Sequence, residues 1–174
     1  MSKSRPYYEK NITNPEVRVI VDEFKKLSAQ KDIRFTKTVT IGFTKIYRKT
    51  VIGLCHYGTD FREIDLDSTY WKNSTWMSKI SLLYHELSHC YCKRDHDFGN
   101  GEKYVEPANF DVRKIVNPTK PFYSGDFCPV ELAAGFLEDG CAKSIMYPVL
   151  ISDNCFIKHY DYYVKEMFNR CTPY

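Results

Sequence analysis

The sequence predicts one α+β domain. A small mixed β-sheet is joined by an N-terminal helix and by a helix that carries a histidine motif, and an irregular C-terminal lobe ending in a helix follows. Three observations indicate this class: apolar residues recur at helical spacing before residue 31, alternate with polar residues over much of 36–67, and return to helical spacing over 76–92. We therefore expect residues 1–174 to form a single domain, with an upper lobe over about 1–92 and a lower lobe over about 93–174.

Composition indicates a folded protein with neither a nucleic-acid nor a membrane partner. The chain is 43% hydrophobic and 16% aromatic, and no apolar run approaches the roughly 18 residues of a membrane helix. A net charge of +3 is too small to favour nucleic acid. No apolar stretch follows the basic residues near the N-terminus, so we expect a cytoplasmic protein unless the sequence is a trimmed form of a secreted one.

The first helix is expected to begin at Pro15. Asn14 supplies a capping side chain, and proline suits the first turn of a helix. Apolar residues then follow at helical spacing, at Val17, Ile20, Val21, Phe24 and Leu27. These signals predict a helix that ends near Gln30.

Three strands are expected next. Residues 36–46 alternate between apolar and polar side chains, and residues 51–57 form a nearly continuous apolar run of the kind found at the centre of a sheet. In residues 62–67, Ile64 and Leu66 alternate with acidic side chains. This polar face predicts that the third strand is the edge of the sheet.

A helix with an apolar face follows the strands. Asn73, Ser74 and Thr75 offer capping side chains at its start. Its apolar residues recur every three or four positions and predict a face directed at the sheet, while the histidines lie on a different face. The apolar residues are Trp76, Ile80, Leu83, Leu87 and Tyr91.

The remaining chain is expected to be irregular at first. Residues 93–128 are rich in glycine, proline and charge and predict a long connection. A short helix over 130–138 is expected to stop at Gly140, and residues 144–148 are expected to form a turn. Ser152 or Asp153 is expected to cap a final helix.

His85, Glu86 and His89 form the pattern H-E-x-x-H on the second long helix. Residues four apart project from one face of a helix, one turn apart, which suits two ligands of one zinc ion. Glu86 then lies beside the metal, where it can take a proton from water. The pattern predicts a hydrolytic site with one catalytic Zn²⁺.

Together with the turn Ser144-Ile145-Met146-Tyr147-Pro148, this motif resembles the metzincin metallopeptidases. The resemblance implies a twisted sheet whose antiparallel edge strand aligns the substrate, expected here near residues 63–67. It also implies a Met-turn that places Met146 under the zinc as a structural residue. The implied activity is that of a zinc-dependent endopeptidase, which hydrolyses peptide bonds through a metal-activated water with Glu86 as general base. We expect a monomer that acts on a peptide or protein substrate.

The third zinc ligand departs from the family pattern. Metzincins have H-E-x-x-H-x-x-G-x-x-H/D, but Cys92 stands at the glycine position and Asp95 at the position of the third ligand. Without glycine the helix is expected to run further before it turns. One added residue places His96 at the metal, and Asp97 then follows it as aspartate commonly follows the third histidine in metzincins. We therefore predict His96 as the third ligand and keep Asp95 as the alternative.

Seven cysteines, without the spacing of a zinc ribbon, predict neither a full disulfide framework nor a structural zinc. In an oxidising compartment Cys128 would be able to pair with Cys141, or Cys155 with Cys171. Small buried packing is the expected role of Cys92.

Two alternative functions remain open. One is a DNA-associated H-E-x-x-H protease, for which a basic stripe or a zinc ribbon would be expected, and the other is a non-catalytic binding module stabilised by zinc. The hydroxyl of Tyr147, Tyr162 or Tyr163 is a candidate donor to the reacting carbonyl. His56 and His159 have no motif around them and are not expected at the metal.

Overall fold

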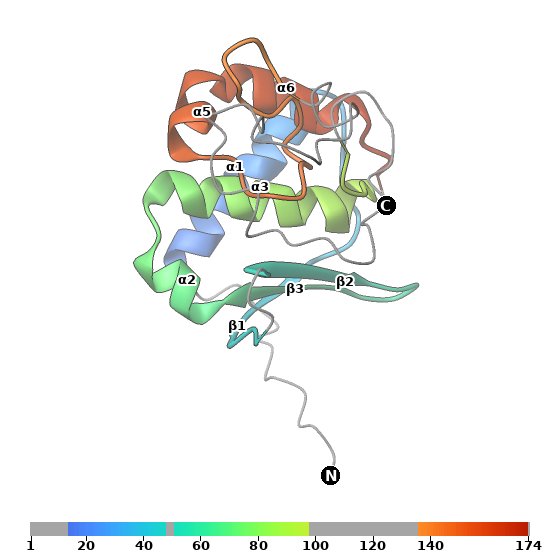
Figure 1. Cartoon of the computed structure of the whole chain (residues 1–174). Helices are drawn as coiled ribbons and strands as arrows, with labels where there is room; N and C mark the ends of the chain where they lie inside the picture. The colour runs from blue at the N-terminus through green and yellow to red at the C-terminus, as the bar shows by residue number, and fades with distance from the viewer. Residues whose placement is uncertain (1–13, 48–50, 98–135, 174) are drawn as a thin grey trace, which may run out of the picture.

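The computed structural model describes residues 14–47, 51–97 and 136–173, which form a layered α+β fold as expected. In Figure 1 the sheet forms one layer, α3 runs across the middle with α1 behind it, and α5 and α6 cover the other side. The elements are α1 (Pro15–Ala29), β1 (Thr40–Thr44), β2 (Gly53–Tyr57), β3 (Arg62–Asp67), α2 (Ser68–Asn73), α3 (Trp76–Cys92), α5 (Asp153–Lys158) and α6 (Tyr160–Asn169).

The sheet has the strand order β1-β3-β2, with β1 parallel and β2 antiparallel to β3. The expected order of the strands was therefore wrong. β3, which has the polar face, lies in the centre of the sheet, and β2, which has the apolar run, lies at an edge. The acidic side chains of β3 find local partners: Asp65 pairs with His56 at 3.3 Å, and Asp67 accepts hydrogen bonds from the amides of Ile46 and Tyr70. The apolar residues near β2 line a cavity instead.

Helix α1 forms where the sequence predicts it. The side chain of Asn14 accepts a hydrogen bond from the amide of Val17 at 3.1 Å, and Pro15 occupies the first turn. Its apolar stripe is buried, and the ring of Phe24 packs against Tyr84 and Tyr91 of α3 at centroid distances of 5.7 and 6.2 Å. These aromatic contacts hold α3 against α1.

Helix α3 lies at the centre of the fold. Thr75 caps its start by accepting a hydrogen bond from the amide of Ser78 at 3.1 Å. Its middle is buried because the sheet, α1, α5 and α6 all contact it.

The short helix α2 precedes α3 and was not predicted, since six residues are too few to show a helical period. Among the described helices, none combines the length and the apolar character needed to span a membrane.

The C-terminal lobe differs from expectation in two places. Residues 136–138 are not helical, because Phe136 bridges Ala142 across a turn in which Gly140 has φ 83°, and residues 98–135 lie outside the described part. The final helix is divided into α5 and α6 at His159, whose ring contacts Asp139 at 2.7 Å. Ser152 caps α5, as one of the two alternatives predicted.

Three disulfides join the elements, so the expectation of no disulfide framework was wrong. They are Cys55–Cys90, Cys92–Cys171 and Cys141–Cys155. Both suggested pairs fail, because Cys141 and Cys155 bond each other and Cys171 bonds Cys92. The sequence could not assign these partners, because pairing depends on distances in the folded chain.

Candidate metal centre

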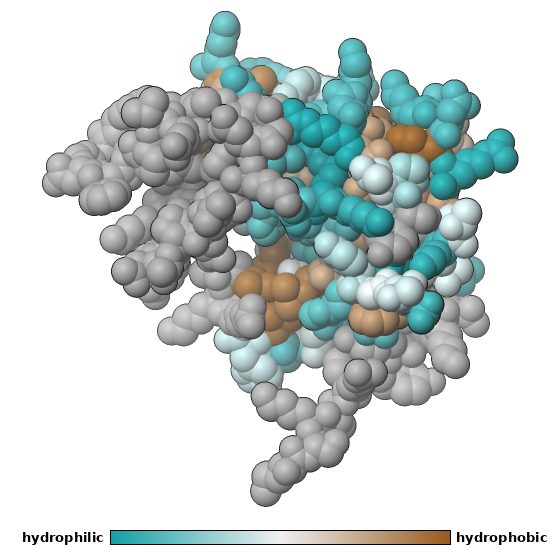
Figure 2. Space-filling model, turned by 90° about the vertical axis from the view of Figure 1, so that its right-hand side faces the viewer, coloured by the Kyte–Doolittle hydropathy of each residue, from teal (hydrophilic) through white to brown (hydrophobic). Residues whose placement is uncertain are grey.

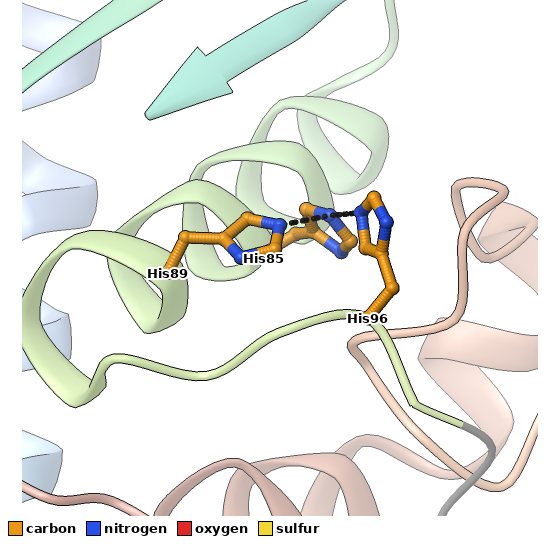
Figure 3. A group of neighbouring side chains, drawn as sticks. All are labelled: His85, His89 and His96. Carbon is orange, nitrogen blue, oxygen red and sulfur yellow. Dashed lines mark hydrogen bonds between the residues drawn. The ribbon is translucent and has the colours of Figure 1, made fainter. Parts of the chain in front are cut away.

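The structure brings His85, His89 and His96 together. Figure 3 shows His85 and His89 projecting from α3 towards His96, which lies on the segment after the helix. The Nε2 atom of His85 is 3.1 Å from that of His89 and 3.1 Å from that of His96. Ligands about 2.0–2.1 Å from a tetrahedral zinc ion lie about 3.3 Å apart, so these nitrogen atoms fit such an ion.

Two backbone carbonyls orient the rings on α3. The Nδ1 atom of His85 lies 2.7 Å from the carbonyl oxygen of Ile145, and Nδ1 of His89 lies 2.5 Å from that of Arg94. When Nδ1 donates its proton to a carbonyl, Nε2 keeps the lone pair that a metal needs. The rings are therefore held in the tautomer that suits metal binding.

The two rings on α3 are also held in the neutral state. Burial, together with the neighbouring His89 and His96, moves the pKa of His85 well below its ordinary value. Burial, followed by the charge of His96, lowers the pKa of His89 to about 4. A neutral imidazole is the form that binds a metal. The surroundings of His85 and His89 thus favour their neutral, metal-binding form even without a metal ion.

The chain leaves α3 one residue later than the resemblance to metzincins implies. Cys92 is still helical and bonded to Cys171, while Lys93 takes the left-handed conformation with φ 52°. The segment that follows brings a ring nitrogen of His96 within 4.8 Å of those of His85 and His89, whereas the exposed Asp95 is not one of the three clustered groups. This geometry favours His96 over Asp95.

Glu86 lies in the same cavity as the histidines and is 4% exposed. Burial raises the pKa of its carboxyl to about 8, which suits a group that exchanges protons near neutral pH. Gly53 leaves the room for this side chain, since a Cβ atom at that position would lie 2.5 Å from Glu86 Oε1. This requirement could not be predicted from the sequence, because Gly53 is far from the motif along the chain.

The site opens into a cavity of about 470 Å³ between α3 and β2. Tyr57 and Leu54 line it from the strand, Leu82 from the helix, and Val149 and Leu150 from the segment after the turn at 144–148. On the face shown in Figure 2, hydrophobic surface gathers in a hollow at the height of the sheet, while most of the described surface around it is hydrophilic. The cavity thus has apolar walls and a polar end formed by Glu86 and the histidines.

The tyrosines suggested from the sequence do not converge on this cavity. Tyr162 and Tyr163 donate hydrogen bonds to the carbonyls of Lys143 and Ala142, each at 2.6 Å, and Tyr147 is buried. Tyr57 and Tyr70 line the cavity instead, although neither lies in a motif. Among the described tyrosines, these are the two that line the cavity.

The other two histidines lie away from the centre, as expected. His56 pairs with Asp65, and His159 pairs with Asp139. Asp139 and His159 cluster with Cys141, but the sulfur of Cys141 is bonded to Cys155 and is not available to a metal. Met146 is fully buried, in keeping with a structural role.

Comparison with known proteins identifies one family. Residues 6–118 match the model of a family described as "Putative phage metallopeptidase". This match covers the sheet, α3 and all three histidines of the centre. The search of the curated proteins found no match, and the search of the solved structures found none.

Proposed function

The chain belongs to the phage metallopeptidase family, and from this premise we propose that it is a zinc-dependent endopeptidase of metzincin type. The observation that carries the proposal is the convergence of three imidazole nitrogens beside a buried glutamate in one cavity. In this proposal His85, His89 and His96 hold the ion, Glu86 is the general base, and Met146 supports the site from below. Three nitrogen ligands leave a fourth position open, as in catalytic zinc sites.

A bound zinc ion would supply Lewis acidity, which acidifies water and polarises a carbonyl group. The side chains of the chain would do the rest. Glu86 would accept a proton from the attacking water and pass it to the departing amine. Burial raises the pKa of this carboxyl above its ordinary value, which favours uptake of the proton.

The substrate would lie along β2. Among the described strands, β2 is antiparallel to its neighbour, forms an edge of the sheet, and borders the cavity. An extended peptide can pair with such an edge through backbone hydrogen bonds. This role was expected for residues 63–67, but β3 is paired on both sides and has no free edge to offer. Val149 and Leu150 would then contact an apolar substrate side chain.

The test is the substitution Glu86→Gln, which keeps the size of the side chain and removes the base. We expect cleavage of a denatured protein to fall by about 10²–10⁴-fold while one zinc ion per chain remains bound, because Glu86 is not a ligand. The matched control is Glu23→Gln, at a partly exposed glutamate of α1. Near-normal cleavage by the Glu86→Gln protein would contradict the proposal, and a parent protein that binds zinc without cleaving would favour a non-catalytic module.

A further inference from the structure

A buried cluster of four polar side chains joins α6 to the segments that carry the metal centre. Arg94 follows α3, Asp97 lies three residues further on, Ser144 begins the turn at 144–148, and Glu166 lies on α6. None of the four is more than 8% exposed. Charged groups buried in this way must be paired, so their contacts define one arrangement.

Arg94 is the centre of this cluster. Its Nη2 atom donates to Glu166 Oε1 at 2.6 Å, to Asp97 Oδ2 at 2.8 Å and to Ser144 Oγ at 3.1 Å. Its Nη1 atom donates to the carbonyls of Glu166 and Met167, each at 3.2 Å. Guanidinium groups bind carboxylates in a fixed planar geometry, so these bonds set the position of the chain at Arg94.

Glu166 also binds the turn. Its Oε2 atom accepts a hydrogen bond from the amide of Ile145 at 3.0 Å, while its Oε1 atom accepts one from Ser144 Oγ at 3.2 Å. The Oγ atom of Ser144 in turn accepts from the amide of Met146, and the carbonyl of Met146 accepts from the amide of Asp97. The turn and the segment that carries His96 are thus tied together.

The two residues that Glu166 holds are those whose carbonyls orient the imidazoles. Ile145 binds Glu166 through its amide and His85 through its carbonyl. Arg94 binds Glu166 through its side chain and His89 through its carbonyl. His96 lies between Arg94 and Asp97, which are both fixed in the cluster. A single carboxylate therefore contacts the two residues whose carbonyls orient His85 and His89, and one of these, Arg94, lies two residues before His96.

We propose that Glu166 is a positioning residue of the metal centre, which fixes the imidazoles through Ile145 and Arg94. The inference rests on the proposed function, because it requires that the three histidines bind a metal. Glu166 does not contact the histidines itself, and nothing in the sequence around it marks a role in the site. Groups that orient metal ligands typically contribute about 10–100-fold to metal affinity.

The experiment compares Glu166→Gln, Glu166→Asp and Ser144→Ala with the parent protein. Gln keeps the size and removes the charge, Asp keeps the charge and shortens the side chain, and Ala removes only a hydroxyl. The matched control is Tyr163→Phe, which removes the 2.6 Å hydrogen bond from α6 to the carbonyl of Ala142 but touches neither support of the imidazoles. Zinc affinity is measured by competition with a chelator, and the absorption spectrum of the cobalt-loaded protein reports ligand geometry.

We expect Glu166→Gln to lower zinc affinity by about 10–100-fold and to shift the cobalt spectrum, with Ser144→Ala and Glu166→Asp showing the same changes to a smaller extent. Tyr163→Phe is expected to match the parent in both measurements. If Glu166→Gln does not fold, Ser144→Ala and Glu166→Asp decide the matter. Parental affinity and spectrum in the folded variants would overturn the inference while leaving the metal site intact. A parent protein that binds no zinc would overturn the proposed function as well.

Discussion

Gly53, where β2 begins, lies directly beside the carboxylate of Glu86 on α3. Any side chain at this position would meet Glu86 Oε1 at 2.5 Å, so either the strand or the carboxylate would have to move. Both outcomes disturb the proposed reaction, because the strand would align the substrate and the carboxylate would take the proton. The absence of a side chain at Gly53 therefore allows β2 and the carboxylate of Glu86 to lie this close together.

We predict that Gly53→Ala reduces kcat by at least about 10-fold, because small displacements of a reacting group cost up to about 100-fold. Its control is Gly58→Ala, where the added Cβ atom would also meet a neighbour at 2.5 Å. That neighbour is the ring of Phe61, which is 49% exposed and can move aside. Equal losses in the two variants would argue against a specific role for Gly53.

At the scale of single residues, the sequence predicted those features of the site that depend on the spacing of residues along one helix. His85 and His89 share a face of α3 because they are four residues apart, and Glu86 lies beside them for the same reason. Ile145, Arg94 and Glu166 could not be predicted, because their roles depend on contacts between segments far apart in the chain. Neither the periodicity of the sequence nor a short motif indicates such contacts.

Among the elements, the end of α3 decides which side chain reaches the proposed metal. The helix continues through Cys92, and the left-handed turn falls at Lys93. We predict that His96→Ala lowers zinc affinity by several orders of magnitude, since a three-ligand site loses one ligand, while Asp95→Ala changes it by less than about 10-fold. Zinc titration of the two variants side by side checks this. Loss of zinc from the Asp95→Ala protein alone would reverse the assignment.

The position of each strand in the sheet was one of the element-level properties that the sequence did not determine. An alternating pattern shows only that one face of a strand is buried, and β3 satisfies this in the centre, because Asp65 and Asp67 on its other face have local partners. A continuous apolar run normally indicates burial on both faces. At β2 it reflects the apolar wall of the cavity.

Across the whole molecule, disulfides link segments that the proposed reaction needs in register. Cys55–Cys90 ties β2 to α3, and Cys92–Cys171 ties the end of α3 to the C-terminal segment. The closed loops span 35 residues and 79 residues, against 14 for Cys141–Cys155. Longer loops lose more chain entropy when they are closed, so the contributions to stability are unequal.

We predict that replacing both cysteines of a pair with serine lowers the free energy of unfolding most for Cys92–Cys171, by about 4.5 kcal/mol, and least for Cys141–Cys155, by about 3 kcal/mol. The variant without Cys55–Cys90 is expected to lie between them, at about 4 kcal/mol. Denaturant unfolding in the absence of reductant measures the order. An unchanged unfolding midpoint in all three variants would show that the bonds do not form.

Metal removal tests most directly whether the three histidines bind a zinc ion that is required for peptide hydrolysis. The parent protein is assayed for zinc content and for cleavage of a denatured protein before chelation, after chelation, and after one equivalent of zinc is returned. We predict one zinc ion per chain, loss of cleavage on chelation and recovery on return of zinc, with no recovery for His85→Ala. Undiminished cleavage by the metal-free parent would contradict the account.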